Sequence, residues 1–108
     1  MFKVINNKIY LTRGDSASFV PSVTDDSGNA YTIQADDTVI MTVKKTTSDT
    51  AYLFQKNLIN SEFAIKPADT EALDYGDYVY DVQLTMANGY NDTIIPPTLF
   101  RIMEEVTF

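Results

Sequence analysis

Alternating apolar and polar positions predict short β-strands along most of the chain. The longest alternation covers residues 77–86, where every second side chain is apolar: Tyr78, Tyr80, Val82, Leu84 and Met86. This period of two is typical of a strand with one buried face. Asn88-Gly89 follows and predicts a tight turn in which both residues take positive φ, so residues 90–95 are expected to return as a hairpin.

Shorter alternations upstream predict the remaining strands. We expect one strand around residues 38–44 and short ones at residues 8–12, 51–55 and 62–66. Residues 17–24 and 30–33 are expected to pair as a hairpin across the turn-rich segment 25–29. The side chains predicted to point inward are Phe19, Val39, Met41, Val43, Phe63, Ile65, Tyr78, Tyr80, Val82 and Leu84, with Ile9 and Leu11 as further candidates.

The last strand carries an interrupted pattern. Pro96-Pro97 removes two backbone donors, and the alternation changes its parity there. After the prolines, the side chain that points inward is either that of Leu99 or those of Phe100 and Ile102, depending on how the bend is counted. We therefore expect a broken strand at an edge of its sheet.

The fold class follows from closely spaced short strands and one corner. Residues 67–73, ending before Gly76, predict a single helical turn. The pattern predicts an antiparallel immunoglobulin-like (Ig-like) β-sandwich of seven to eight strands, in one domain over residues 1–108. In such sandwiches a tyrosine hydroxyl ties the corner to the next strand, and Tyr75 and Tyr78 are the candidates. A closed barrel suits the interrupted last strand less well.

Composition excludes several classes of function but says less about the fold. The 108 residues carry a formal charge of −7, and they include neither cysteine nor histidine. Thiolate or imidazole zinc sites, disulfides and histidine-dependent triads are therefore excluded. Scattered basic residues in an acidic chain argue against nucleic acid as a partner. The sequence has neither a long apolar run nor a signal-peptide pattern, so we expect no membrane association and synthesis in the cytoplasm.

Several polar motifs have both a functional and a structural interpretation. Arg13-Gly14-Asp15 matches an integrin-recognition tripeptide, yet glycine followed by aspartate also suits a simple turn. Asn91-Asp92-Thr93 fits a glycosylation acceptor, but without a secretory signal the start of a strand is preferred. The candidate calcium ligands are Asp25, Asp26, Asn29, Asp36 and Asp37. They lack the order of an EF-hand loop and suit solvated turns equally well.

Two carboxylate pairs are candidates for acid and base catalysis: Asp74 with Asp77, and Glu104 with Glu105. Such chemistry needs a cleft that separates the two pKa values, which small sandwiches with short loops seldom provide. We therefore expect no enzymatic activity and no catalytic, metal or cofactor-binding residues.

The aromatic residues point to a surface that contacts a partner. The chain has 7 Tyr and 6 Phe, more than two short sheets can enclose. Those expected to lie outside the core are Tyr10, Tyr31, Tyr52, Phe54, Tyr75 and Tyr90. Tyrosine is enriched at protein interfaces, although cross-strand pairing explains such residues equally well.

Four segments read together carry a family resemblance: residues 9–19, 37–45, 73–84 and 89–96. This series resembles small proteins encoded by tailed phages and prophages of Gram-positive bacteria, and it is similar to the amino-terminal Ig-like domain of phage baseplate upper proteins. The resemblance implies a structural protein of the virion, in the tail or baseplate, with no catalytic residues. Baseplate upper proteins continue into a region with receptor-binding parts, whereas this chain stops at Phe108, as an adaptor, a head or neck component or a prophage remnant would.

The expected function is therefore that of a non-enzymatic phage structural or assembly module that contacts other virion proteins. The alternative is a bacterial Ig-like module that binds a surface or a carbohydrate. Residues 8–12 and 51–55 are expected to be open sheet edges, while Pro96-Pro97 and Glu104-Glu105 protect another. Because the charge of −7 opposes close packing of copies, we expect a monomer or weak dimer in dilute solution and higher order only on a scaffold.

Overall fold

The regular structure of the chain is almost entirely β-structure. The computed structural model describes residues 2–23 and 28–104, and within these ranges it contains eight strands and one short helix. The elements are β1 (Phe2–Ile5), β2 (Lys8–Thr12), β3 (Ala17–Phe19), β4 (Thr38–Lys44), β5 (Phe54–Asn57), β6 (Phe63–Ile65), α1 (Pro67–Thr70), β7 (Gly76–Thr85) and β8 (Asn91–Met103). No helix in this part of the chain has the length and apolar character needed to cross a membrane.

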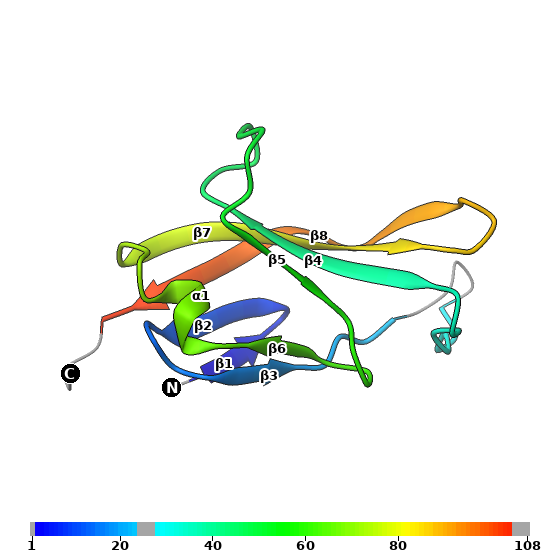
Figure 1. Cartoon of the computed structure of the whole chain (residues 1–108), viewed down its shortest axis with the longest axis horizontal. Coiled ribbons are helices and arrows are strands. Elements are labelled where there is room, and N and C mark those ends of the chain that lie inside the picture. Colours follow the sequence, from blue (N-terminus) through cyan, green and yellow to red (C-terminus); the bar gives the residue numbers. More distant parts are fainter. Residues whose placement is uncertain (1, 24–27, 105–108) are drawn as a thin grey trace.

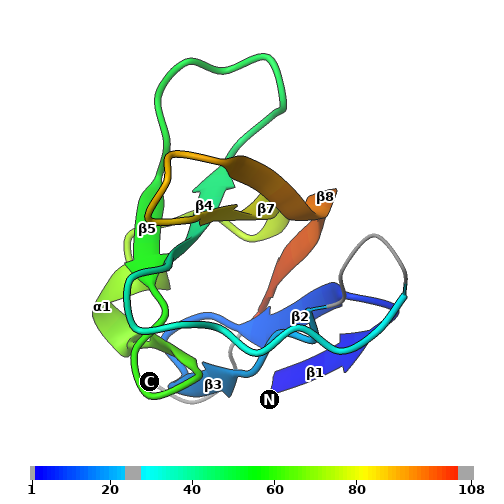
Figure 2. The ribbon, with the colours of Figure 1, turned by 90° about the vertical axis from the view of Figure 1, so that its right-hand side faces the viewer.

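The strands form two sheets that enclose one core. The larger has six strands in the order β1-β2-β8-β7-β4-β5, and the smaller pairs β3 with β6. The larger sheet curls: β4, β7 and the first half of β8 lie in one layer, and the end of β8 runs down to β2 beside the small sheet (Figures 1 and 2). The expectation of purely antiparallel pairing is wrong at one place, because β2 and β8 are parallel, with Tyr10 opposite Arg101.

The buried side chains come from both sheets. All ten side chains predicted to point inward are buried, as are Ile9 and Leu11. Phe19 of the small sheet packs edge-on against Tyr80 of the large one, with 6.0 Å between ring centroids. Tyr80 in turn lies 6.2 Å from Phe100. Phe54 and Ile95 are buried although they lie outside the predicted core, and Phe100 and Ile102, one of the two inward alternatives for the last strand, are buried as well.

The β7–β8 hairpin is confirmed, but its turn is one residue longer than predicted. The Met86 amide donates to the Tyr90 carbonyl over 2.8 Å, which leaves three residues in the loop. Gly89 alone in this loop takes positive φ, at 87°, instead of both Asn88 and Gly89. This arrangement matches a three-residue hairpin loop that ends on a left-handed glycine.

The expectation of a broken last strand at an edge is wrong for β8 as a whole. β8 runs continuously over 13 residues and lies between β2 and β7. Its register against β7 shifts near the prolines: Ile95 faces Val82 and Thr98 faces Tyr80, so Pro96-Pro97 lies opposite Asp81 alone. This extra residue changes the parity of the strand, which is why Phe100 and Ile102 point inward and Leu99 does not.

The prolines cost no ladder bonds to β2. The pairing between β2 and β8 starts only at Phe100, and residues 91–99 pair with β7 alone. The first half of β8 is therefore an edge locally, which is the setting that tolerates proline.

The predicted hairpin of residues 17–24 with 30–33 is seen only in part among the described residues, as a bridge at Ala30 and a contact between Tyr31 and Val23. β3 covers only Ala17–Phe19 and pairs with β6, bringing Phe19 opposite Phe63. The Tyr31 amide still donates to the Val23 carbonyl over 2.9 Å, so the connecting segment closes as a loop. Turn residues 24–27 lie outside the described part of the chain. The pairing of β3 with β6 buries Phe19 against Phe63, with ring centroids 6.2 Å apart.

One strand was not anticipated, and it changes which edges are open. β1 forms a hairpin with β2, and the turn residues Asn6 and Asn7 take positive φ of 50° and 66°. Asparagine tolerates this left-handed conformation, which two-residue hairpins require. Residues 8–12 are therefore not an edge, because β2 lies between β1 and β8. The other expected edge is confirmed as β5, although this strand begins at Phe54 instead of Ala51.

The corner before β7 forms as predicted. α1 is a single turn, and the Asp69 carboxylate accepts a hydrogen bond from the Lys66 amide over 2.7 Å. The Tyr78 hydroxyl donates to the Asp74 carbonyl over 2.8 Å. Of the two tyrosine candidates, Tyr78 is therefore the one that ties the corner to the strand.

Candidate interaction surfaces

Both arginines of the sequence stack on tyrosines where β2 and β8 end. The guanidinium of Arg13, just after β2, lies 4.3 Å from the ring centroid of Tyr75. It also donates to the Tyr75 hydroxyl over 3.0 Å and to the Leu73 carbonyl over 3.3 Å. A cation over an aromatic face is attracted by the ring quadrupole. Arg13 is thus fixed in one conformation by three contacts.

The second arginine belongs to a row of residues across three strands. Tyr10 of β2 lies opposite Arg101 of β8, and Arg101 lies opposite Asp77 of β7. Arg101 donates to the two carboxylate oxygens of Asp77, from Nε over 2.6 Å and from a terminal nitrogen over 3.2 Å. Its guanidinium lies 5.6 Å from the Tyr10 ring. The hydrogen bond from Arg101 lowers the pKa of Asp77, and Asp77 raises the pKa of Arg101.

We name these five side chains, Tyr10, Arg13, Tyr75, Asp77 and Arg101, the Arg–Tyr surface. They lie where β2 and β8 end and β7 begins (Figure 1). Tyr75 remains 41% exposed and Asp77 is also exposed. Tyrosine and arginine dominate the binding energy of many protein interfaces, and side chains already held in one rotamer lose less entropy on binding. The arrangement is suited to contact with another protein.

The turn that carries Arg13 is anchored to the corner helix. Gly14 takes a φ of 81°, and its amide donates to the Thr70 hydroxyl over 2.9 Å. Thr70 is fully buried although its side chain is polar. The Asp15 amide donates to the Thr12 carbonyl over 3.1 Å, which closes the turn. Arg13-Gly14-Asp15 therefore serves as a structural turn whose arginine packs on the protein itself.

A second feature lies on the outer face of the large sheet. Residues 45–53, which join β4 to β5, stand out from this face (Figures 1 and 2) and form a wall beside it. At its foot is a hollow of about 280 Å³, which we name the outer-face depression. Its lining residues are Thr42, Lys44, Thr50, Tyr52, Gln55, Asp81 and Gln83.

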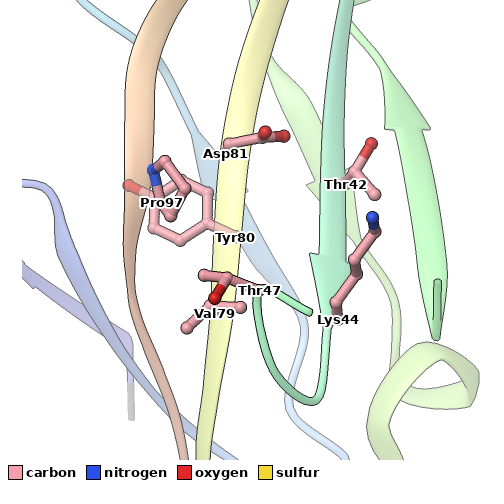
Figure 3. Close-up of a pocket in the computed structure, with 7 residues that line it drawn as sticks. All are labelled: Thr42, Lys44, Thr47, Val79, Tyr80, Asp81 and Pro97. Carbon is pink, nitrogen blue, oxygen red and sulfur yellow. The ribbon is translucent and has the colours of Figure 1, made fainter. Parts of the chain in front are cut away.

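A smaller hollow of about 70 Å³ adjoins it and shares Thr42, Lys44 and Asp81. Figure 3 shows the Asp81 carboxylate extending from β7 toward β4, on which Thr42 and Lys44 lie. Burial raises the pKa of Asp81, and the charge of Lys44 opposes this shift. No hydrogen bond to the Asp81 carboxylate is found among the described residues. The carboxylate is thus partly desolvated, and only the charge of Lys44 compensates in part.

The candidate calcium ligands among the described residues are not brought together into a metal site. Asp37 accepts hydrogen bonds from the Tyr31 hydroxyl over 2.6 Å and from the Gln34 amide over 2.9 Å, so it closes a loop. Its hydrogen bond raises the pKa of Tyr31. Asp36 is exposed, and Asp25 and Asp26 lie outside the described residues. Within residues 2–23 and 28–104, no three carboxylates cluster in a way that could hold a metal ion.

The other predicted site residues take structural places. Asp77 pairs with Arg101, the backbone of Asp74 accepts from Tyr78, and both aspartates are exposed. Glu104 is exposed and Glu105 lies outside the described residues. Asn91 begins β8, where its side-chain oxygen accepts from the Thr85 hydroxyl over 2.7 Å.

The tyrosines divide between several places. Tyr10 and Tyr75 meet at the Arg–Tyr surface, Tyr52 lines the outer-face depression, and Tyr90 is exposed beside the hairpin turn. Phe54 is a correction, because it is buried and packs edge-on against Phe100 at 5.9 Å. Sequence reasoning missed the outer-face depression entirely. The only local signal was the pair of charged residues, Lys44 and Asp81, at the outward positions of two predicted strands.

Comparison of the chain with known protein families, with curated proteins and with solved structures finds no match.

Proposed function

We propose that this protein is a non-enzymatic structural module of a tailed phage or prophage, built as an Ig-like sandwich, that acts through contacts with other virion proteins. The observation that carries the contact role is the Arg–Tyr surface. Both arginines of an acidic chain are held there on tyrosine rings in fixed conformations. The phage assignment rests on the resemblance of residues 9–19, 37–45, 73–84 and 89–96 to phage structural proteins.

The strand order supports the Ig-like part of the proposal. β3 and β6 form one sheet, while β4, β5, β7 and β8 lie together in the other. In Ig-like sandwiches strands B and E likewise share one sheet, while strands C, F and G form the opposite sheet. The one-turn helix and the Tyr78 hydroxyl bond before β7 match the tyrosine corner of that class.

The first test asks whether the protein is part of a particle. In the host strain, phage particles are induced and purified, and the protein is measured in them by quantitative mass spectrometry. We expect a fixed copy number per particle, and its gene should lie among genes for tail, portal or lysis proteins. Absence from intact, infectious particles overturns the proposal.

The second test asks whether the Arg–Tyr surface makes the contact. Arg101→Ala removes an exposed arginine, and the expected result is a loss of most of the protein from particles while the isolated domain stays folded. Lys45→Ala is the matched control, because it also removes one exposed cation, from the β4–β5 loop. Equal incorporation of both variants would show that the contact lies elsewhere.

The isolated protein is expected to be a monomer or weak dimer. Its charge of −7 opposes packing of copies at low salt, and screening reaches only about 10 Å at 0.1 M. The open edge at β5 is only four residues long, which limits edge-to-edge pairing. Light scattering coupled to size exclusion measures the mass directly; a stable trimer or hexamer at micromolar concentration contradicts this expectation.

A further inference from the structure

The outer-face depression has a lining of unusual uniformity. All seven of its side chains carry a polar group. These are the hydroxyls of Thr42, Thr50 and Tyr52, the amides of Gln55 and Gln83, and the charged groups of Lys44 and Asp81. Sites for apolar ligands are lined mainly by hydrophobic side chains. The ligand that fits this lining is therefore polar.

The charges of the lining decide what kind of polar ligand it takes. Lys44 is the one cation and Asp81 the one carboxylate among the lining residues, so their charges cancel. A phosphate or sulfate group would face Asp81 at close range, in a chain that already carries −7. A metal ion would find a single carboxylate beside an ammonium group. A neutral ligand meets neither repulsion.

The hydrogen-bonding capacity calls for a ligand that both donates and accepts. The ionised Asp81 carboxylate only accepts, and its two oxygens can take hydrogen bonds from two adjacent hydroxyls. Lys44 only donates. The Gln55 side-chain nitrogen donates to the Thr42 hydroxyl over 3.0 Å, which orients its amide oxygen as an acceptor for something else. The Asp81 carboxylate is partly buried and accepts no hydrogen bond from the described residues, so hydrogen bonds from ligand hydroxyls would stabilise its ionised form.

Tyr52 adds an apolar plane beside these polar groups. It stands on the β4–β5 loop, lines the depression and is 54% exposed. The loop is held in shape by the Asp49 carboxylate, which accepts from the Thr46 amide over 3.2 Å. A sugar ring combines adjacent hydroxyls with a flat C–H face that packs on an aromatic ring.

We propose that the outer-face depression binds a neutral saccharide, with the Asp81 carboxylate accepting from two adjacent hydroxyls and the Tyr52 ring covering one face of the sugar. This site is separate from the Arg–Tyr surface, and the inference does not depend on a place in a virion. One sugar unit occupies the larger hollow, and the smaller one beside Thr47 and Pro97 extends it in the direction of a second unit.

The test begins with the full chain on an array of neutral, N-acetylated and acidic oligosaccharides. The strongest neutral binder is then titrated in solution and followed by amide chemical shifts. We expect a dissociation constant of about 1 mM or tighter, with the largest shifts at Thr42, Asp81 and Gln83. If no neutral oligosaccharide binds, if only acidic ones bind, or if the shifts map to another face, the proposal is overturned.

Matched variants separate the site from general surface effects. Asp81→Asn and Tyr52→Ala are each expected to weaken binding about tenfold or more, as loss of a charge-assisted hydrogen bond or a stacking plane predicts. Asp36→Asn and Tyr90→Ala are the controls. Asp36 is exposed, and the exposed fraction of Tyr90, 52%, is similar to that of Tyr52. Equal loss in Tyr52→Ala and Tyr90→Ala would mean that binding is not located at this depression.

Discussion

Two carboxylates on the same strand, Asp77 and Asp81, behave in opposite ways. They lie on the outer face of β7, but the pKa of Asp77 is lowered and that of Asp81 is raised. The neighbouring strands make the difference. Asp77 faces Arg101 on β8, whereas the bulge places Pro96-Pro97, which carries no donor, opposite Asp81. At one end of this face the carboxylate is thus hydrogen-bonded to Arg101, whereas at the other end the Asp81 carboxylate accepts no hydrogen bond from the described residues.

This contrast teaches where binding capacity can arise on a regular sheet. Alternation along β7 puts polar residues outward at both places, so the strand alone does not distinguish them. At the Arg–Tyr surface, partners on β2 and β8 complete the contacts and hold side chains ready for another protein. At the outer-face depression, the β4–β5 loop adds a wall, and the Asp81 carboxylate accepts no hydrogen bond from the described residues.

The largest expected effect comes from the inner face of β7, which supports both regions. Val82 is fully buried, and Val82→Asp places an unpaired charge in the core. This should cost several kcal/mol, enough to unfold a domain of about 5–15 kcal/mol stability. The neighbour Gln83 points outward, so Gln83→Asp should leave a cooperative melt within about 1 kcal/mol. A normal melt for Val82→Asp would remove the core assignment and, with it, the comparison.

The second effect tests the anchoring of the Arg–Tyr surface. Thr70→Val keeps the shape of a buried side chain but leaves the Gly14 amide without its acceptor. We expect a loss of about 1–2 kcal/mol in urea unfolding, and altered chemical shifts at Arg13 and Tyr75 but not at Tyr52. Thr93→Val, at an exposed position on β8, is the control. Unchanged shifts at Arg13 would show that the turn does not depend on Thr70.

A smaller effect is expected at the corner itself. Tyr78→Phe removes the hydroxyl that donates to the Asp74 carbonyl, next to Tyr75. The loss should be about 1 kcal/mol, the usual net worth of one hydrogen bond. Tyr90→Phe, at an exposed tyrosine, should be neutral in the same unfolding assay. Equal stabilities for the two variants would assign the corner no energetic role.

The smallest effects separate the two carboxylates by pH. The lowered pKa of Asp77 means that its ion pair stabilises the fold above the ordinary Asp pKa of about 3.9 and that this contribution fades as pH falls through the lowered value. The raised pKa of Asp81 has the opposite sign: its ionised form opposes folding as pH rises past the ordinary value.

At pH 7, Asp77→Asn should therefore lower the melting temperature slightly and Asp81→Asn should raise it slightly. Both differences from the parent chain should shrink toward zero as the pH falls through the pKa values of the two carboxyls. Calorimetric melts of the three proteins across this range measure the effect. Shifts of the same sign for the two variants at pH 7 would contradict the assigned environments.

The sequence by itself determined the strands with clean alternation and the side chains they bury. β4 and β7 form where the period of two predicts, and the corner helix and the β7–β8 hairpin follow from local signals at Pro67 and Gly89. These features depend on residues a few positions apart, whose side chains the backbone geometry alone assigns to one face. The sequence also predicts that Tyr10 and Tyr75 lie outside the core, but it does not place them on one surface.

Tertiary structure decided what depends on residues far apart in the chain. The pairing of β3 with β6, the parallel contact of β2 with β8, and the parity change at Pro96-Pro97 are set by how the two sheets share one core. The same holds for the sites, because Arg13 meets Tyr75, and Asp81 meets the wall at Tyr52, only across such contacts. Local alternation carries no information on which strand becomes the neighbour, and the neighbour determines whether an outward charge is paired or open.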